Sequence, residues 1–268
     1  MSLSMPPLGA GTFRLKGDAA YHSVATSLKQ GYRHIDTAQI YGNEAEVGQA
    51  IADSGIARDA LFITTKVWMD KLEEDKFLPS VNESLAKLKT DYVDLLLIHW
   101  PLPDDGVAME RYLTQLYVAQ QQGLARHIGV SNFTCQQLDD AIEILGPGRL
   151  YTNQIEVHPL LQNHKVVEHC DANGLLVTAY MPLAVGKVLE EPVIVETARQ
   201  AGCTPAQATL AWIRQLGMAT IPSSTNPAHL QANLDSMAVT LSPQQMAAFD
   251  ALDRGERLAN PDFAPDWD

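Results

Sequence analysis

The chain has 268 residues, of which 46% are hydrophobic, and its 32 acidic against 19 basic residues give a formal net charge of −13. The ordinary apolar content excludes disordered and fibrous classes, and the negative charge argues against nucleic acid or an anionic membrane surface as a partner. No apolar run of about 18 residues is present, so we expect no transmembrane helix.

The N-terminal residues and the cysteines indicate the compartment. Residues 1–8 lack the basic stretch and the apolar segment of a secretory signal. Cys135, Cys170 and Cys203 are odd in number, far apart and without the spacing of metal ligands. Such thiols are typical of a reducing cytosol. We therefore expect a cytoplasmic protein without a bound metal.

Seven apolar runs have the length and composition of buried strands. They span residues 32–37, 61–68, 92–100, 126–131, 151–157, 175–180 and 218–222. The stretches between them have helical character. One helix is predicted from Asp18, a good N-cap, to Gly31. Another is predicted from a capping box with a proline at its first turn, TPAQ at 204–207, to Gly217.

Strands that alternate with helices predict a parallel sheet with right-handed crossovers. A weak eighth strand is predicted near residues 237–241. Eight such units close a (β/α)8 TIM barrel, whereas six would favour an open doubly wound sheet. No Pro-, Gly- or Ser-rich linker interrupts the pattern, so we expect one α/β domain over residues 1–268.

In such a barrel the active site lies at the C-terminal ends of the strands, so the polar residues there are candidates. Asp36, Lys66 and His99 end three consecutive predicted strands. A buried lysine needs a countercharge, which Asp36 can supply, and a salt bridge that merely closes the barrel is the alternative explanation. His99 alone would more often be a core residue, but three ionisable strand ends favour a site.

Tyr41 follows the first of these strands by five positions and adds a proton donor. A nearby ammonium stabilises a phenolate and lowers the tyrosine pKa. Lys66 is therefore expected to tune Tyr41 as a general acid, while Asp36 holds Lys66. His99 can donate a hydrogen bond to a substrate oxygen. This set suits protonation of a carbonyl oxygen whose carbon receives a hydride.

Several segments resemble the signatures of the aldo-keto reductase family. GYRHIDTA at 31–38, followed by Tyr41, Glu44 and Gly48, resembles the first signature, and IGVSNF at 128–133 resembles the second. Similar blocks are TK at 65–66, LIHWP at 97–101, NQIE at 153–156 and AYMPL at 179–183. They keep the family order from about Leu8 to the C-terminus. The short length and IPSST at 221–225 resemble the bacterial branch that reduces 2,5-diketo-D-gluconate and methylglyoxal.

The resemblance implies an NADP-dependent oxidoreductase with a catalytic tetrad and a nicotinamide site. The implied tetrad is Asp36, Tyr41, Lys66 and His99. The implied contacts of the nicotinamide are Ser131, Asn132, Gln154 and Tyr180, with Thr12 and Leu183 nearby. Alternatives remain, since a Ser–Asn pair can simply cap a helix and Tyr180 can be core packing. Residues 9–14 (GAGTFR) lack the third glycine of a dinucleotide fingerprint, and the resemblance places them in an N-terminal hairpin.

The segment that would hold the 2′-phosphate of NADPH departs from the family pattern. The expected cofactor contacts there are Ser223, Ser224, Thr225, His229 and Asn233. Ser223 stands where the family has lysine, His229 where it has arginine and Ala232 where it has glutamate. Neutral donors hold a phosphate more weakly than a bidentate arginine, but the start of the following helix favours an anion. We expect NADPH preference, with a narrower margin than in relatives that keep both cations.

The substrate is expected to be a small carbonyl compound. Phe13, Trp68 and Trp100 are predicted to line an apolar mouth. The loop at 101–106 and the C-terminal tail are short, so we expect an open site that accepts aldehydes and α-dicarbonyls. Parallel barrels leave no sheet edge to pair, so we expect a monomer.

Two other functions fit parts of the sequence. A non-catalytic cofactor-binding module would not need the complete tetrad. A barrel glycosidase could use Glu156, which the sequence leaves ambiguous between that role and support of the site, but it would leave Lys66 and Tyr41 unexplained.

Overall fold

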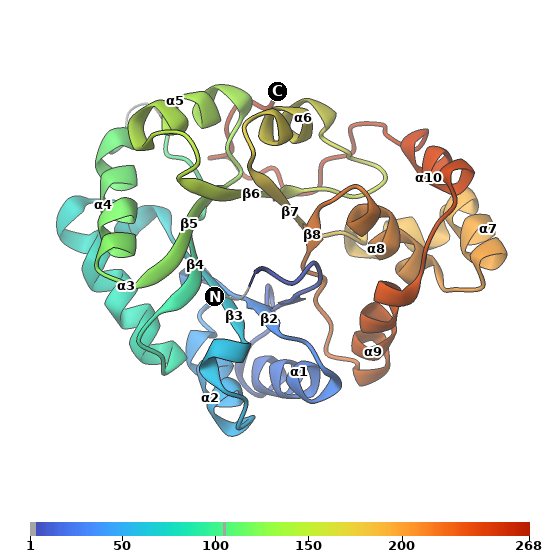
Figure 1. Cartoon of the computed structure of the whole chain (residues 1–268), viewed down its shortest axis with the longest axis horizontal. Coiled ribbons are helices and arrows are strands. Elements are labelled where there is room, and N and C mark those ends of the chain that lie inside the picture. The colour runs from blue at the N-terminus through green and yellow to red at the C-terminus, as the bar shows by residue number, and fades with distance from the viewer. Residues whose placement is uncertain (1–3, 104–105) are drawn as a thin grey trace.

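A computed structural model describes residues 4–103 and 106–268 of the chain. Within these residues, eight parallel strands follow one another around a barrel, each beside its neighbour in sequence (Figure 1). The strands are β1 (Ala10–Gly11), β2 (His34–Asp36), β3 (Phe62–Val67), β4 (Val93–Ile98), β5 (Ala125–Ser131), β6 (Leu150–Glu156), β7 (Leu176–Tyr180) and β8 (Ala219–Thr220). The predicted (β/α)8 fold is confirmed, and each of the seven predicted runs contains or overlaps a strand.

Helices surround the strands on the outside of the barrel (Figure 1). They are α1 (Gly17–Gln30), α2 (Glu44–Asp53), α3 (Glu74–Leu88), α4 (Met109–Gln121), α5 (Cys135–Leu145), α6 (His164–Ala172), α7 (Pro192–Ala201), α8 (Pro205–Gln215), α9 (Pro227–Asp235) and α10 (Pro243–Asp250). Short 3-10 turns, η1 (Gln39–Tyr41), η2 (Arg58–Ala60), η3 (Met69–Lys71), η4 (Ala184–Glu190) and η5 (Ser236–Ala238), lie between them. None of the helices in the described part of the chain is long and apolar enough to cross a bilayer.

The predicted cap residues are found at two of the four ends of these two helices. α1 ends where Gly31 adopts a left-handed φ of 115°, which glycine tolerates. Asp18 is not its N-cap, because the helix begins one residue earlier and Lys16 occupies that position. α8 begins with the predicted capping box, in which Thr204 and Gln207 exchange side-chain and main-chain hydrogen bonds, and it ends two residues before Gly217.

The strand that completes the barrel lies at the N-terminal end of the chain, so the expected eighth strand at 237–241 is wrong. Those residues form η5 and an extended stretch whose main chain at Val239 and Leu241 is held by the side chains of Arg214 and Gln215. Their main chain is therefore bound to helix α8, away from the sheet.

The expected N-terminal hairpin is also wrong for residues 9–14, which instead contain β1, parallel to β2. The amides of Gly9 and Gly11 donate to the carbonyls of Thr220 and Pro222 at 2.8 and 3.0 Å, and this closes the barrel against β8. A Cβ at Gly11 would lie 2.5 Å from the Ile221 carbonyl oxygen. This close approach of two backbones explains the glycine at that position.

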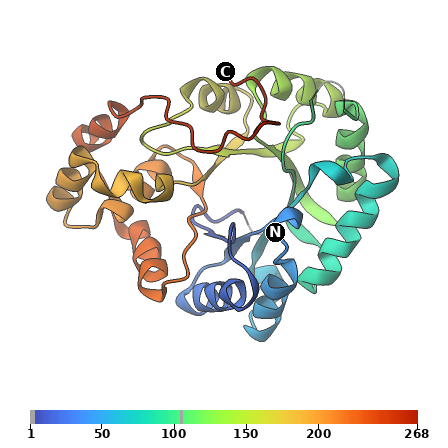
Figure 2. The ribbon, with the colours of Figure 1, turned by 180° about the vertical axis from the view of Figure 1, so that it is seen from behind.

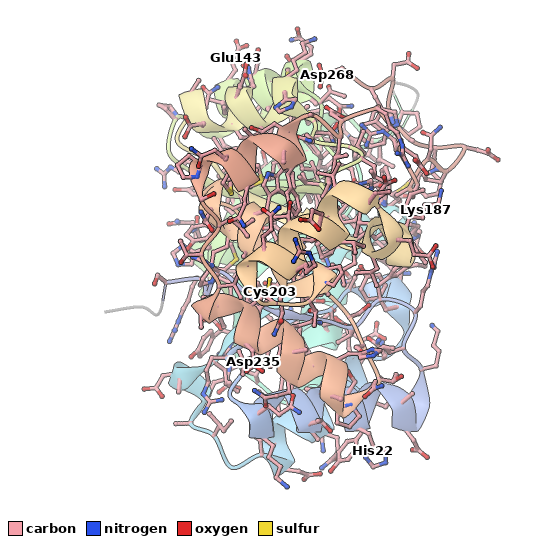
Figure 3. All side chains as sticks on the ribbon, turned by 90° about the vertical axis from the view of Figure 1, so that its right-hand side faces the viewer. His22, Glu143, Lys187, Cys203, Asp235 and Asp268 are labelled. Carbon is pink, nitrogen blue, oxygen red and sulfur yellow. The ribbon has the colours of Figure 1, made fainter. Side chains whose placement is uncertain are left out.

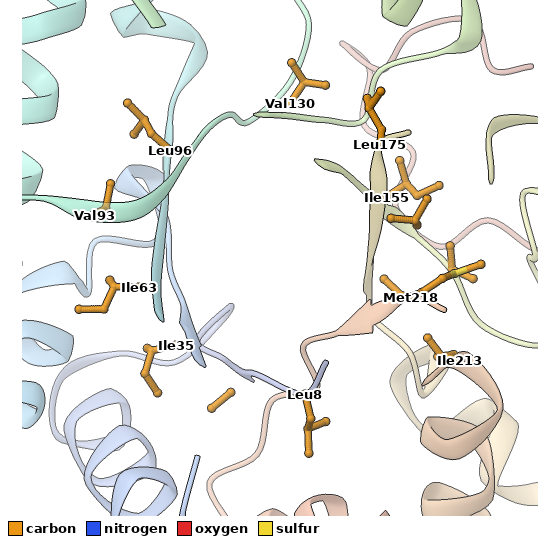
Figure 4. Packing of buried hydrophobic residues seen from close by; sticks show 14 of the residues in the cluster. Leu8, Ile35, Ile63, Val93, Leu96, Val130, Ile155, Leu175, Ile213 and Met218 are labelled. Atoms are coloured by element: carbon orange, nitrogen blue, oxygen red, sulfur yellow. The ribbon is translucent and has the colours of Figure 1, made fainter. Parts of the chain in front are cut away.

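The alternation of side chains along each strand separates the two faces of the barrel wall. Ile35, Ile63, Leu96 and Val130 point outward and pack beneath the helices (Figure 4). A separate apolar cluster, formed by Met5, Phe62, Leu95, Leu97 and Ala219, fills the inside. Side chains alternate between the two faces of a strand with a period of two residues. Lys66 therefore points inward like Phe62 on β3, and His99 points inward like Leu97 on β4.

Candidate active site

Four chemically active side chains meet at the C-terminal end of the barrel. Asp36 ends β2, Lys66 lies near the end of β3, and His99 directly follows β4. All three are buried, with at most 8% of each residue exposed. Tyr41 ends η1, the turn that follows β2, and lines a pocket together with Asp36. The structure therefore brings together the four residues that the sequence predicted as a tetrad.

Lys66 is the centre of this group. Its Nζ donates to Oδ1 of Asp36 at 2.5 Å, to the carbonyl oxygen of Thr37 at 3.0 Å and to the hydroxyl of Tyr41 at 3.4 Å. The other carboxylate oxygen of Asp36 accepts from Nε2 of Gln154 at 2.8 Å. An ammonium has three protons to donate, so the buried charge of Lys66 is both paired and fully hydrogen-bonded.

Burial dominates the protonation states of the site. It raises the pKa of Tyr41 well above the usual value of 10, and the negative charge of Asp36 adds to this rise. The expectation that Lys66 would give Tyr41 a lowered pKa is therefore wrong in its net direction, because desolvation of the phenolate is the larger effect. The consequence is that Tyr41 carries its proton at neutral pH.

Lys66 and His99 are shifted in the opposite sense. Burial lowers the pKa of Lys66, and the neighbouring Asp36 opposes that shift. Burial also lowers the pKa of His99 well below its usual value, and the charge of Lys66 adds to the effect. His99 is therefore neutral at physiological pH. Its Nδ1 is buried without a hydrogen-bond partner among the described residues.

The four residues implied to contact a nicotinamide form one hydrogen-bonded group beside the tetrad. Asn132, with a left-handed φ of 63°, accepts from the hydroxyl of Tyr180 at 2.8 Å. Its amide nitrogen donates to the carbonyl of His99 and to Oγ of Ser131, both at 3.1 Å. The side chain of Gln154 donates to Asp36, and its main-chain carbonyl accepts from Oγ of Ser131 at 2.7 Å. These contacts link the predicted nicotinamide site directly to the predicted tetrad.

A groove extends from this pocket toward the start of α9. Its lining residues include Arg14, Leu183, Ser223, Ser224 and Thr225, and it shares Phe13, Met181, Pro182 and Ser223 with the pocket that contains Tyr41. This continuity gives the groove the shape to hold an extended ligand whose reactive end meets Tyr41.

Three predicted cofactor contacts lie elsewhere. Thr12 is fully buried, and its hydroxyl donates to the carbonyl of Asp36 at 3.0 Å, so it joins β1 to β2. His229 is exposed on the first turn of α9, and Asn233 is buried in the same helix. Neither of these two is among the residues that line the groove.

Phe13, Trp68 and Trp100, the predicted substrate contacts, all line the cleft above the tetrad. The ring of Phe13 lies 5.2 Å from that of Tyr41, and the ring of Trp68 lies 5.1 Å from that of His99, both measured between centroids. Arg14 and Lys16 are the charged residues at the rim of this cleft. The loop at 101–106 contains Asp104 and Asp105, which lie outside the described residues.

The C-terminal tail, residues 251–268, was missed as part of the site. Leu258, Ala259, Asn260, Pro261 and Phe263 line the cleft opposite Phe13. The tail is therefore a wall of the site despite its short length, and the openness of the site to larger carbonyl compounds stays a prediction. Its aromatic residues, Phe263 and Trp267, were the one available signal in the sequence.

Glu156, which the sequence left ambiguous, is fully buried, and both of its carboxylate oxygens accept hydrogen bonds from the main chain of the tail. A glycosidase acid must face its substrate, so these contacts argue against that alternative.

The described residues include no group of three or more His, Cys, Asp or Glu side chains placed to hold a metal.

Comparisons with known proteins agree with this geometry. Residues 7–254 match the model of the aldo/keto reductase family. Methylglyoxal reductase DkgB of Yersinia pestis is 53% identical over 99% of this chain and 100% of its own length. The enzyme of the same name from Escherichia coli O157:H7 is 49% identical over the same shares.

Solved structures show the same likeness. One described as a 2,5-diketo-D-gluconic acid reductase B superposes with a TM-score of 0.95 at 42% identity, covering 98% of this chain and 94% of that chain. The aldose reductase of Schistosoma japonicum superposes with a TM-score of 0.90 at 31% identity, covering 95% of this chain and 91% of that chain.

Proposed function

The chain belongs to the aldo/keto reductase family, and from this premise we propose that it reduces aldehydes and α-dicarbonyls to alcohols with NADPH, using Tyr41 as the general acid. The observation that carries the proposal is the position of the Tyr41 hydroxyl, 3.4 Å from the buried Lys66 ammonium and at the base of a cleft. The names of the relatives support methylglyoxal and 2,5-diketo-D-gluconate as the first substrates to test.

The residues of the groove fit a nicotinamide cofactor. Tyr180 offers an aromatic ring beside the catalytic pocket, and Ser131, Asn132 and Gln154 offer amide and hydroxyl groups at the same place. Further along, Ser223, Ser224 and Thr225 offer hydroxyl groups to a phosphate. When bound, NADPH supplies the hydride that the substrate carbon receives.

The chain's own residues supply the proton. Tyr41 is protonated because burial raises its pKa, and its hydroxyl faces the cleft in which a carbonyl oxygen would lie. As that oxygen gains charge it accepts the Tyr41 proton, and Lys66 stabilises the phenolate that remains. Asp36 keeps Lys66 charged and in place. His99 is neutral, and we assign it one hydrogen bond to the same oxygen.

The same premise leads to proposals about the state of the protein. We propose a cytoplasmic monomer that needs no metal. Light scattering that shows a stable dimer would contradict the first of these statements. Activity that a chelator removes and that zinc restores would contradict the last.

A direct assay tests the function. NADPH absorbance is followed with methylglyoxal, with 2,5-diketo-D-gluconate and with a panel of aldehydes of increasing size, and kcat/KM is compared. We expect carbonyl-dependent oxidation of NADPH. Cofactor binding without turnover of any carbonyl would instead favour a non-catalytic cofactor-binding module.

A further inference from the structure

The C-terminal tail returns from α10 across one open end of the barrel. Figure 2 shows it in dark red, close to the segments around α5 and α6. Its last residue, Asp268, reaches the first turn of α5, where its carboxylate accepts from the amide of Cys135 at 2.9 Å. Figure 3 labels Asp268 on the same side of the molecule as Glu143 of α5. The tail is thus fixed at its far end as well as where it leaves α10.

Between these two points the tail borders the catalytic pocket. Ala259 lines the pocket that contains Asp36, Tyr41 and Tyr180, and Leu258 lines the adjoining cleft with His99. The position of this short piece of main chain therefore sets the width of the space available to a substrate beside Tyr41.

Glu156, the last residue of β6, holds this piece of main chain. Its Oε1 accepts from the amide of Leu258 at 2.9 Å, and its Oε2 accepts from the amide of Ala259 at 2.8 Å. Nε2 of His158 contacts Oε1 at 2.9 Å. Glu156 and His158 are both fully buried, so the carboxylate is fixed to the barrel wall on one side and to the tail on the other.

The charge state of Glu156 strengthens its hydrogen bonds to the main chain of the tail. Burial acts to raise its pKa, but the hydrogen bonds from His158, Ala259 and Leu258 outweigh burial and hold the pKa below its usual value. The carboxylate is therefore ionised at neutral pH. Hydrogen bonds to an ionised acceptor are about twice as strong as neutral ones, so these are strong contacts between the cleft-lining part of the tail and the barrel.

Other contacts hold the neighbouring parts of the tail. The amide of Glu256 donates to the carbonyl of Leu160 at 2.9 Å. The ring of Phe263 packs edge-on against Trp68 and Trp100, with centroids 5.7 and 5.4 Å away. These contacts lie before and after the Leu258–Ala259 pair, so they keep the tail on the barrel without fixing that pair itself.

We propose that Glu156 is a positioning residue that sets the carbonyl selectivity of the enzyme by fixing the main chain of Leu258 and Ala259 beside Tyr41. The inference rests on the proposed reductase function. It differs from support of the fold in general, because it assigns Glu156 an effect on the substrate and none on the phosphate-bearing part of the cofactor. The groove that we assign to that part of the cofactor contains no residue of the tail among its lining.

The test compares Glu156→Gln with Asp253→Asn. Glutamine keeps the size of the side chain but turns an NH2 group toward one of the two main-chain donors. Asp253 is a matched control, because its Oδ1 also accepts two main-chain amides, those of Gln162 at 3.4 Å and Gly255 at 3.2 Å, away from the cleft. Steady-state kinetics are measured with methylglyoxal and with a bulky aromatic aldehyde, and NADPH affinity is measured by fluorescence.

For Glu156→Gln we expect KM for the carbonyl to rise by about tenfold or more, because a displaced wall loses contacts that bind the substrate equally in the ground state and the transition state. The ratio of kcat/KM between the two substrates should change as well, with NADPH affinity and kcat for methylglyoxal held within about twofold. Asp253→Asn should leave all four quantities unchanged. Equal kinetics for the two variants, or loss of NADPH affinity in step with kcat, would overturn the proposal.

A second variant keeps the proposal testable if Glu156→Gln folds poorly. Ala259→Val leaves the Glu156 contacts intact and adds two methyl groups to the wall. We expect it to lower kcat/KM for the bulky aldehyde about tenfold or more relative to methylglyoxal, and an unchanged ratio would overturn the assignment of this wall.

Limited trypsin digestion provides a readout that does not depend on turnover. Cleavage after Arg257 should be faster in Glu156→Gln than in either wild type or Asp253→Asn. Equal cleavage rates would overturn the anchoring role. If the wild-type protein reduces no carbonyl but Glu156→Gln still speeds cleavage, the proposed function is refuted. The anchoring role of Glu156 then stands on its own.

Discussion

The ammonium of Lys66 and the carboxylate of Asp36 form an ion pair of 2.5 Å in which neither side chain is more than 2% exposed. A charge is costly to bury alone, and a buried pair repays this cost only when its remaining protons and lone pairs are also bonded. Thr37, Tyr41 and Gln154 provide those bonds. The pair therefore contributes to the stability of the barrel and also fixes the ammonium that lies beside the Tyr41 hydroxyl.

Replacing Tyr41 with phenylalanine removes the only proton donor that we assign to the substrate. We expect kcat for carbonyl reduction to fall about 10² to 10⁴-fold, the usual contribution of a positioned general acid. NADPH binding should be unchanged, because the ring of Tyr41 remains. Steady-state assays and a fluorescence titration measure the two effects. Retention of more than about a tenth of wild-type kcat would rule out Tyr41 as the acid.

Lys66→Met tests whether Lys66 tunes Tyr41. Reduction needs protonated Tyr41, so activity is present below the Tyr41 pKa and is lost as pH rises through it. Burial already raises that pKa above 10, and loss of the cation should raise it further. We expect a lower kcat at pH 7, because the acid is weaker, and an alkaline limb of kcat/KM displaced to higher pH.

The control for Lys66→Met is Lys71→Met, which removes an exposed lysine paired with Asp70 on the surface. We expect this variant to keep both the rate and the pH profile of the wild type. If Lys66→Met also leaves the alkaline limb in place, Lys66 has a structural role only.

Asp36→Asn should destabilise the fold as well as slow the reaction. It leaves the buried charge of Lys66 without a partner, a change that costs about 3 to 5 kcal/mol. The matched control is Asp70→Asn, which breaks an exposed pair worth less than about 1 kcal/mol. Urea unfolding at pH 7 measures both variants. Similar midpoints for the two would show that the Asp36–Lys66 pair contributes no more than a surface pair.

Much of the barrel was predictable because its strands are long enough to show an apolar pattern with a polar end. Residues 62–67 of β3 are a clear case, since the run ends at Lys66 and the two-residue period fixes the side to which Lys66 points. The same reasoning placed Asp36 and His99 beside it. Convergence of the strand ends is a property of the fold, so recognising the fold was sufficient to bring these residues together.

The parts that were not predictable depend on contacts between residues distant in sequence. β1 contains only Ala10 and Gly11, too few residues to carry a pattern, and it is defined by its partners on β2 and β8. Glu156 and the tail are about one hundred residues apart along the chain. The raised pKa of Tyr41 likewise depends on how completely the packed structure excludes water, which no local sequence feature records.

Cofactor preference rests on the start of α9, where the chain lacks the two cations of the family pattern. Several polar groups there are already engaged. Oδ1 of Asn226 accepts from the amide of Ala228 at 2.9 Å, and Oγ of Ser224 accepts from the amide of Asn226 at 3.1 Å. Ser223 and Thr225 are exposed beside them, and His229 is exposed on the first turn. Apart from Arg14 in the lining of the groove, a phosphate would therefore meet neutral donors, which bind it more weakly than charged ones.

We therefore expect this enzyme to prefer NADPH over NADH by a small margin at pH 7. His229→Arg should strengthen NADPH binding by about 1.5 to 3 kcal/mol, the value of a hydrogen bond to a charged group. NADH affinity should stay constant in this variant, because NADH has no 2′-phosphate to be recognised. Fluorescence titrations of both cofactors at pH 7 measure these changes. Tighter binding of NADH than of NADPH at pH 7 would reverse the proposed cofactor preference, and it would leave the assignment of Tyr41 intact, because the first turn of α9 contributes no residue to the pocket around the Tyr41 hydroxyl.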